Sequence, residues 1–273
     1  MKKIDIDETR KIQMEILNVF IQFCKNNNLS YFLDAGSLLG AVRHSGYIPW
    51  DDDIDVCMPR SDYEKFIQLA RNGLTKNIEL LEPKDNIYPM LKIINTKTRL
   101  VEFPNTIKNN ISVYIDVFPK DGLPDSNLIA NVLCGVCRVL ILWNWFNKVS
   151  IFKWQDEKKW YKRILASIGR KLVNEKNRNR PLTYLDRFAK LYSYDKAIRV
   201  STIVAGGMKN CIERRCFDSY IEMSFEYLNV KIPYGHHEYL LKLYGDYMII
   251  PPEKERITHN NIAYMIDEYE KVR

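Results

Sequence analysis

Four aspartates within five residues, from Asp51 to Asp55, restrict the fold of this chain more than any other stretch. Closely spaced carboxylates repel one another, and burying them is costly unless cations or hydrogen bonds compensate their charge. Apolar residues Ile54 and Val56 are interleaved with the acidic ones, and Pro59 then ends the run. The pattern predicts a short strand that starts in an acidic cluster and continues into an apolar core.

Asp53 and Asp55 are two residues apart, so a strand would place both carboxylates on one face. Carboxylate oxygens are ligands that Mg2+ prefers, together with the phosphate oxygens of a substrate. A third carboxylate, Asp116, lies in the strand-like run 111–118, on the side opposite the stripe of Ile and Val side chains. We therefore expect Asp53, Asp55 and Asp116 to form a catalytic Mg2+ site, with Mn2+ as the alternative ion and Asp116 as the candidate general base.

A small-residue turn, Gly36-Ser37, precedes the acidic run and leads into a short helical pattern. Backbone N–H groups at such a helix start can bind phosphate, and glycine allows close approach. We expect Gly36 and Ser37 to bind substrate phosphate, although a Gly-Ser pair alone is a weak signal. Asp51 and Asp52 fit a solvated turn and a helper role equally well.

Apolar periodicity and β-branched runs alternate along the chain, which predicts an α+β fold with a mixed-sheet core, flanking helices and a basic helical insertion. The predicted helices cover residues 7–26, 61–73, 128–146, 156–173, 183–197, 236–248 and 260–272. The predicted strands cover residues 29–34, 53–58, 78–81, 90–94, 100–103 and 111–118. We expect a core over residues 1–127, the insertion over 128–200, and a C-terminal segment, 201–273, that packs back on the core.

The composition is that of a globular protein, with 273 residues, 46% apolar and 27% charged. Its first residues are polar and lack the apolar stretch of a secretory signal, so we expect a cytoplasmic protein. The six cysteines then fit reduced thiols better than disulfides. Zinc binding by Cys134, Cys137, Cys211 and Cys216 is the less favoured alternative, because the first pair lies in an apolar run.

The net charge of +7 is concentrated in one region. Residues 138–199 hold 16 Lys or Arg and 5 Asp or Glu, a net +11, so the rest of the chain carries −4. Four of the five tryptophans lie in this region, which suits peripheral contact with an anionic membrane surface; a helical subdomain with solvated faces is an equal alternative. The apolar run 128–146 contains Arg138, which makes spanning a membrane costly, so we expect a buried or interfacial helix.

Longer stretches around the acidic run carry a more specific pattern. They are Gly36 to His44 (GSLLGAVRH), Gly46 to Val56 (GYIPWDDDIDV), Ile115 to Pro119, Asp121 to Pro124, Tyr244 to Met248, Pro251 to Glu253, Arg256 and His259. The pattern resembles the LicD family of phosphotransferases, which belongs to the nucleotidyltransferase superfamily and is related to the fukutin proteins. The resemblance reaches from Leu29 to about His259 and is weak between residues 128 and 211. Asn260 departs from it, because a basic residue is expected there.

The resemblance implies a nucleotidyltransferase-like fold and Mg2+-dependent transfer of a phosphorylated small alcohol from a CDP-linked donor. The best known case is phosphocholine from CDP-choline, moved to a sugar hydroxyl of a teichoic acid, lipopolysaccharide or capsule precursor; CDP-ribitol and CDP-glycerol are the alternative donors. The expected acceptor is a lipid-linked glycan at the inner face of the membrane. Arg43, His44, Arg256 and His259 become candidates for phosphate or acceptor contacts, with packing or ion pairing as an equal alternative.

Two other function classes stay open. A noncatalytic scaffold that binds glycan or membrane is one, and the intact set of carboxylates argues against it. A nucleotidyltransferase that uses nucleoside triphosphates is the other, and the basic region favours it. We nevertheless expect no nucleic-acid partner.

Overall fold

The structure, a computed structural model, describes residues 1–102, 109–149, 177–256 and 261–266. Its first long element is α1 (Ile6–Asn26). Asp5 caps this helix, because the Glu8 N–H donates to Asp5 Oδ1 over 2.8 Å while the Glu8 side chain accepts from the Asp5 N–H. Leu17 and Phe20 on the inner face of α1 are fully buried in the main hydrophobic core.

A mixed sheet forms the centre of the fold. Its strands are β1 (Lys2–Ile4), β2 (Phe32–Leu33), β3 (Asp55–Pro59), β4 (Ile78–Leu81), β5 (Leu91–Glu102), β6 (Asn109–Leu123), β7 (Arg199–Ser201), β8 (Ile212–Glu213) and β11 (Ile262–Met265). They follow the order β1-β11-β5-β6-β3-β2, with β4 beside β5 and β7 between β6 and β8. Only β3 and β6 run parallel among the described pairs. Two more strands, β9 (Tyr220–Phe225) and β10 (Leu228–Pro233), form a separate hairpin.

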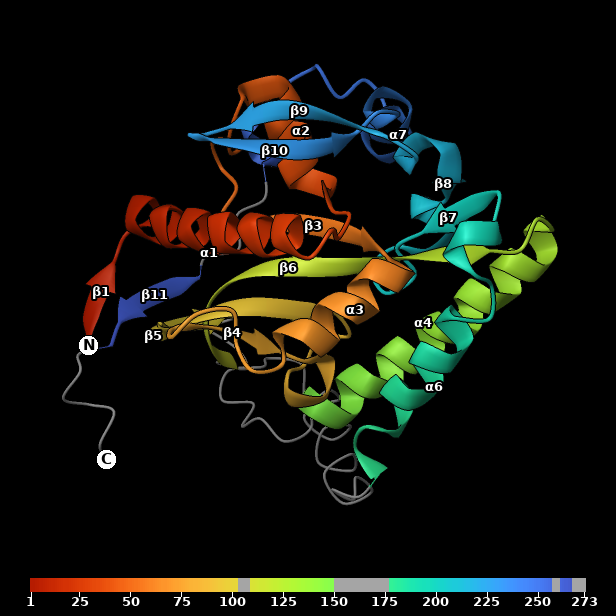
Figure 1. The fold of residues 1–273 in the computed structure, drawn as a ribbon, viewed down its shortest axis with the longest axis horizontal. Coiled ribbons are helices and arrows are strands. Elements are labelled where there is room, and N and C mark those ends of the chain that lie inside the picture. Colours follow the sequence, from red (N-terminus) through yellow and green to blue (C-terminus); the bar gives the residue numbers. More distant parts are fainter. Residues whose placement is uncertain (103–108, 150–176, 257–260, 267–273) are drawn as a thin grey trace.

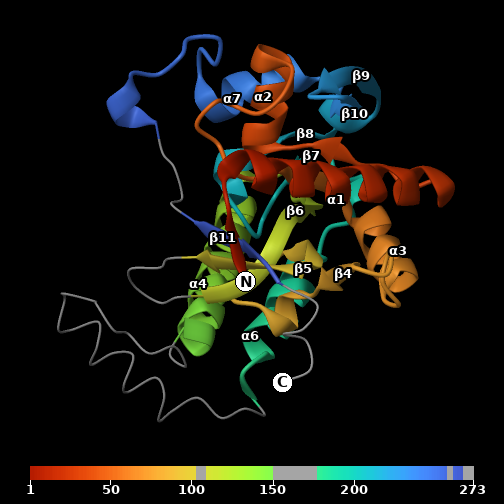
Figure 2. The same ribbon diagram turned by 90° about the vertical axis from the view of Figure 1, so that its left-hand side faces the viewer.

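Helices cover this sheet on both sides. After α1 they are α2 (Ala35–His44), α3 (Arg60–Ala70), α4 (Asn127–Val149), α6 (Arg180–Ala189) and α7 (His236–Tyr244). Figures 1 and 2 show α1 above the sheet and α4 with α6 below it. The same views show α2, α7 and the β9-β10 hairpin together at the top, so the acidic run between α2 and β3 joins the upper layer to the sheet.

The predicted α+β class is confirmed. The predicted strands 90–94 and 100–103 are parts of one strand, β5, whose pairing register with β6 shifts between Asn95 and Leu100. The helix predicted over 260–272 is wrong at residues 262–265, because β11 forms there and pairs with both β1 and β5. Such long-range pairing outweighs a local helical pattern. Residue 260, residues 267–272 and the helix predicted over 156–173 lie outside the described residues.

The apolar run 128–146 is helical, as predicted, and forms most of α4. Its inner face, with Ala130 and Cys137 fully buried, contributes to the packing, and α4 contacts α6. Within the described ranges, α4 is the one helix long and apolar enough to cross a membrane, and about one third of it is buried. The helix predicted over 183–197 corresponds to α6, which ends earlier, at Ala189. The domain boundaries near residues 127 and 200 stay predictions.

Candidate active site

The Gly36-Ser37 pair lies in the first turn of α2, whose N-cap is Asp34. The Asp34 Oδ1 atom accepts a hydrogen bond from the Ala35 N–H over 3.0 Å. Ala35 has a φ of 44°, an uncommon conformation for a residue with a side chain. A Cβ atom on Gly36 would lie 2.8 Å from Asp51 Oδ2, so glycine is needed for this carboxylate to approach the helix start.

Ser37 positions the start of the acidic strand. Its side chain is buried, and its Oγ accepts from the Asp55 N–H over 2.8 Å. The Asp34 N–H donates to the Asp55 carbonyl over 2.9 Å, so β3 begins directly beside α2. These bonds give Ser37 a positioning role, and its contact with phosphate stays a prediction.

Asp55 and Asp116 stand opposite each other in the parallel pair of β3 and β6. Opposite residues of neighbouring strands point to the same face, so the two carboxylates lie together, as predicted from the alternation around Asp116. Asp53 lies two residues before β3 and outside it, which corrects its predicted place in the strand. Its charge nevertheless acts on both Asp55 and Asp116, so its carboxylate belongs to the same cluster.

The carboxylates of this cluster disfavour one another's charge. Burial, followed by the negative charges of Asp53 and Asp116, raises the pKa of Asp55 well above its ordinary value, and Asp34 and Asp51 add to the shift. Burial also raises the pKa of Asp116 to about 6, although a lysine ammonium opposes this shift. Carboxylate oxygens are the donor type that Mg2+ prefers, so the cluster has the donor chemistry of the predicted site, whereas its geometry as a metal site stays a prediction.

Lys92 is the ammonium beside Asp116. It stands opposite Asp116 in the pair of β5 and β6, with its Nζ 2.7 Å from Asp116 Oδ1, and it is only 1% exposed. The ring centroids of Tyr114 and Tyr88 lie 3.3 and 4.4 Å from Nζ. Both phenols donate to the Glu102 carboxylate, over 2.6 and 3.1 Å. The position of Lys92 is therefore fixed by a carboxylate and two aromatic rings.

A second buried lysine, Lys120 of β6, holds the cap of α2. Its Nζ lies 3.0 Å from Asp34 Oδ2, 2.8 Å from Thr202 Oγ1 and 2.6 Å from the Tyr239 hydroxyl. The Tyr239 hydroxyl also donates to Asp34 Oδ1 over 2.7 Å. Because Thr202 follows β7 and Tyr239 lies in α7, this network ties the C-terminal part of the chain to the first turn of α2.

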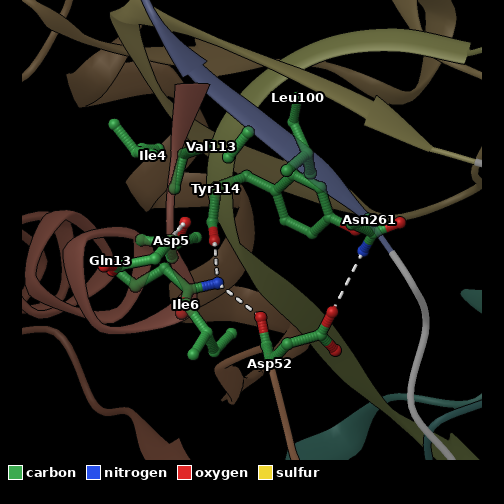
Figure 3. A pocket seen from close by; sticks show the side chains of 11 residues that line it. Ile4, Asp5, Ile6, Gln13, Asp52, Leu100, Val113, Tyr114 and Asn261 are labelled. Carbon is green, nitrogen blue, oxygen red and sulfur yellow. Dashed lines mark hydrogen bonds between the residues drawn. The ribbon is translucent and has the colours of Figure 1, made fainter. Parts of the chain in front are cut away.

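Asp52 lines a cavity of about 70 Å³ beside β1 and β11, with its side chain directed toward Asn261 (Figure 3). Asn261 Nδ2 donates to Asp52 Oδ2 over 3.3 Å, and Gln13 Nε2 donates to the Asp52 carbonyl over 2.9 Å. Gln13 also donates to the Tyr114 carbonyl over 3.3 Å. Asp52 thus joins α1 to the segment before β11, and Gln13 extends the contact to β6. Asp51 instead acts on the Asp55 carboxylate.

Arg43 and His44, at the end of α2, contact each other and the segment after α7. The Arg43 guanidinium donates to the Tyr247 carbonyl over 2.6 Å and to His44 Nε2 over 2.9 Å. Burial and the Arg43 charge lower the pKa of His44, which favours the neutral imidazole that accepts the Arg43 hydrogen bond. Arg256 stacks on Trp50, with its guanidinium carbon 4.5 Å from the ring centroid. These are packing contacts, and substrate binding by the three residues stays a prediction.

Metal binding also stays a prediction. Across the described residues, no group of three or more His, Cys, Asp and Glu side chains has the arrangement of a metal site. Neither the aspartate cluster nor the four cysteines of the zinc alternative therefore form one as the side chains stand. One oxygen of Asp116, a predicted metal ligand, accepts a hydrogen bond from the Lys92 ammonium. His259, a predicted substrate contact, lies outside the described residues.

Asp34, Lys92 and Lys120 were not assigned a role from the sequence, although a sequence pattern indicates a role for each. The two lysines stand alone within or beside apolar strand residues, and a buried charge needs a partner. Asp34 follows an apolar strand and precedes a helix, which is typical of an N-cap.

Comparison with known proteins agrees with this geometry. Residues 28–127 match the LicD/FKTN/FKRP nucleotidyltransferase domain, a range that contains α2, the acidic run and Asp116. The lipopolysaccharide cholinephosphotransferase LicD of Haemophilus influenzae is 27% identical over 275 residues, which is 95% of this chain and 97% of that protein. An uncharacterized protein of Rickettsia prowazekii is 53% identical over 103 residues, which is 36% of this chain and 35% of that protein.

Proposed function

Because this chain belongs to the LicD family of phosphotransferases, we propose that it transfers phosphocholine from CDP-choline to a sugar hydroxyl of a cell-surface glycan precursor. The observation that carries the proposal is the pairing of Asp55 with Asp116 beside the first turn of α2. Helix N-termini bind phosphate and clustered carboxylates bind divalent cations, so this site suits a diphosphate donor. The similarity to the Haemophilus enzyme over nearly the whole chain supports phosphocholine as the transferred group.

Mg2+ is the proposed cofactor, with Mn2+ as the alternative. Asp53, Asp55 and Asp116 would hold it, since they supply only oxygen donors. The raised pKa of Asp55, caused first by burial and then by the charges of Asp53 and Asp116, supports their proximity. When bound, such an ion neutralises charge on the diphosphate of the donor. Lys92 would hold the Asp116 carboxylate on the face of β6 that also carries Asp55.

In the proposed reaction, the acceptor hydroxyl oxygen attacks the phosphorus that carries choline. A new P–O bond to the sugar forms, the P–O bond to CMP breaks, and the hydroxyl proton passes to a site carboxylate, for which Asp116 is the candidate. The N–H groups of the first turn of α2, including Gly36 and Ser37, have no intrahelical acceptor and suit the phosphate oxygens. Most of the rate enhancement then comes from positioning and charge neutralisation.

The proposed acceptor is a lipid-linked precursor of lipopolysaccharide, teichoic acid or capsule, and the proposed location is the cytoplasm at the inner face of the membrane. The Haemophilus relative is a lipopolysaccharide cholinephosphotransferase, and this supports a glycan as the acceptor. All six cysteines are free, which is consistent with a reducing compartment.

Release of CMP tests this proposal. Purified protein with Mg2+, a glycan acceptor and CDP-choline should release CMP, and EDTA should stop the release. Asp55→Asn should lower the rate roughly 100-fold or more, because metal ligands contribute at least as much as the residues that support them. The exposed Asp125→Asn is the matched control and should retain the wild-type rate.

CDP-ribitol, CDP-glycerol and nucleoside triphosphates in parallel reactions separate the alternatives. CMP release from one of the other CDP donors alone would reassign the donor. Incorporation of nucleoside triphosphates into RNA or DNA would overturn the proposal in favour of a nucleotidyltransferase. Absence of product with every donor would favour the noncatalytic scaffold.

A further inference from the structure

A groove of about 610 Å³ lies beside α4, away from the carboxylate cluster. One wall is the outer side of α4, and the other is the loop of residues 203–209 that follows β7. Apolar side chains such as Ile141, Leu142 and Met208 line it, together with two exposed cations, Arg138 and Lys209. The groove therefore combines an apolar floor with positive charge.

The groove continues into an apolar stripe along α4. Leu128, Val132, Val139 and Leu142 are spaced by four, seven and three residues, so they share one face of the helix. These side chains are 75%, 60%, 64% and 61% exposed. A contiguous apolar face of this kind, on a helix whose other side is packed, marks an interaction surface.

We propose that this surface binds an anionic lipid bilayer. The apolar stripe contacts the acyl region, and Arg138 and Lys209 contact lipid phosphate groups. Two exposed tryptophans near the end of α4, Trp143 and Trp145, are of the type found at membrane–water interfaces. Arg138 is exposed and lies about halfway along the length of α4. Because a charge at the centre of a bilayer is costly, the helix lies along the interface and does not cross the membrane.

Charge favours a bilayer over a second copy of this chain. Among the described residues, 138–149 and 177–199 carry 8 basic and 2 acidic side chains, a net +6, which attracts anionic headgroups and disfavours pairing with a second, equally basic copy. Lipid binding goes beyond phosphotransfer. Lipid binding would also bring the enzyme close to a lipid-linked acceptor, and this consequence rests on the proposed function.

Vesicle flotation tests the charge component. The full chain should bind vesicles of phosphatidylcholine mixed equally with phosphatidylglycerol, bind vesicles of phosphatidylcholine alone much more weakly, and dissociate as salt is raised. At about 1 kcal/mol per basic residue near the surface, Arg138→Gln should weaken binding roughly fivefold and Arg138→Gln with Lys209→Gln roughly thirtyfold. Lys65→Gln, on the exposed side of α3, is the matched control and should leave binding unchanged.

A second pair of variants tests the apolar component. Leu142→Asp should abolish binding to the mixed vesicles, because it places a charge in the apolar stripe. Leu69→Asp is the matched control on α3, with a side chain 53% exposed, and should bind like wild type. Circular dichroism melting shows whether each variant is folded.

Equal binding to both vesicle types, binding to neither, or equal losses in the variants and their controls would overturn the proposal. A dimer in sedimentation experiments that Leu142→Asp dissociates, without vesicle binding, would assign the surface to a second copy. Vesicle binding needs no CDP donor, and CMP release with a soluble acceptor needs no vesicle. Failure of this proposal and failure of the proposed phosphotransfer can therefore be distinguished.

Discussion

Asp55, a proposed cation ligand, has a carboxylate that we expect to destabilise the folded protein. Burial and neighbouring carboxylates raise its pKa, so the fold disfavours its ionised form. We predict that Asp55→Asn raises the Tm of the protein in EDTA by about 2–4 °C, or about 1 kcal/mol for a chain of this size. Scanning calorimetry of both proteins measures the difference.

The direction of its pH dependence is also fixed. A carboxyl whose pKa is higher in the folded than in the unfolded protein destabilises the fold fully above the folded pKa. This penalty shrinks as the pH falls below the folded pKa and is gone below the unfolded pKa. The Tm advantage of Asp55→Asn should therefore shrink as the pH is lowered from neutrality. Mg2+ should raise the Tm of the wild type more than that of the variant. A variant that melts below the wild type in EDTA at neutral pH would contradict this account.

Gly36 is predicted to be needed for activity more than for stability. In Gly36→Ala, the new Cβ would lie 2.8 Å from Asp51 Oδ2 and would displace that carboxylate from the helix start. We expect CMP release to fall roughly tenfold or more, because small displacements at a phosphate site are costly to the rate. Gly135→Ala is the matched control, since nothing lies within 4 Å of its Cβ position. It should keep the wild-type rate with a soluble acceptor and gain about 0.5–1 kcal/mol of stability.

At the scale of residues, the sequence was informative wherever the chemistry is local. The Asp-x-Asp spacing indicated Asp53 and Asp55, and strand alternation indicated the side of Asp116. Lys92 was not predicted, because its role depends on a partner 24 residues away that only the pairing of β5 and β6 brings close. Asp51 and Asp52 likewise differ in their surroundings, because Asp51 lies beside Gly36 and Asp52 accepts from Asn261. No local sequence pattern relates either aspartate to its partner.

At the scale of elements, Lys120 joins α2, β6 and α7. We predict that Lys120→Met lowers the free energy of unfolding by about 3–5 kcal/mol, because it leaves the buried Asp34 carboxylate without its cation. Urea denaturation measures the loss. Lys190→Met is the matched control, since its ion pairs with Glu64 and Asp186 are 38% to 49% exposed and should contribute less than about 1 kcal/mol. Equal stability of the two variants would show that the network does not hold α7 against α2.

Elements with strong local periodicity could be predicted, and those defined by distant pairing could not. The helix α1 and the strand β4 follow directly from the apolar pattern. Residues 262–265 were assigned to a helix because their apolar residues fit helical spacing over a longer window. Four residues carry little pattern of their own, and their strand conformation comes from hydrogen bonding to β1 and β5 on both sides.

At the scale of the whole molecule, the sheet brings the two ends of the described chain together. β11 lies between β1 and β5, with Ala263 opposite both Ile4 and Leu100. These residues form a second hydrophobic cluster with Val113 and Tyr114. The Tyr114 ring also packs on the Lys92 ammonium, so the cluster is continuous with the support of Asp116.

This continuity predicts that a change far from Asp116 in sequence affects both stability and transfer. Ala263 is 4% exposed, so Ala263→Asp would bury a charge without a partner and should lower the free energy of unfolding by about 3 kcal/mol or more. Leu69→Asp, at an exposed position, should change it by less than about 0.5 kcal/mol. Urea denaturation gives the stabilities, and CMP release at a temperature where both variants remain folded gives the rates. If Ala263→Asp were folded and as stable as Leu69→Asp, the C-terminal strand would not be an integral part of the sheet that supports the carboxylate cluster.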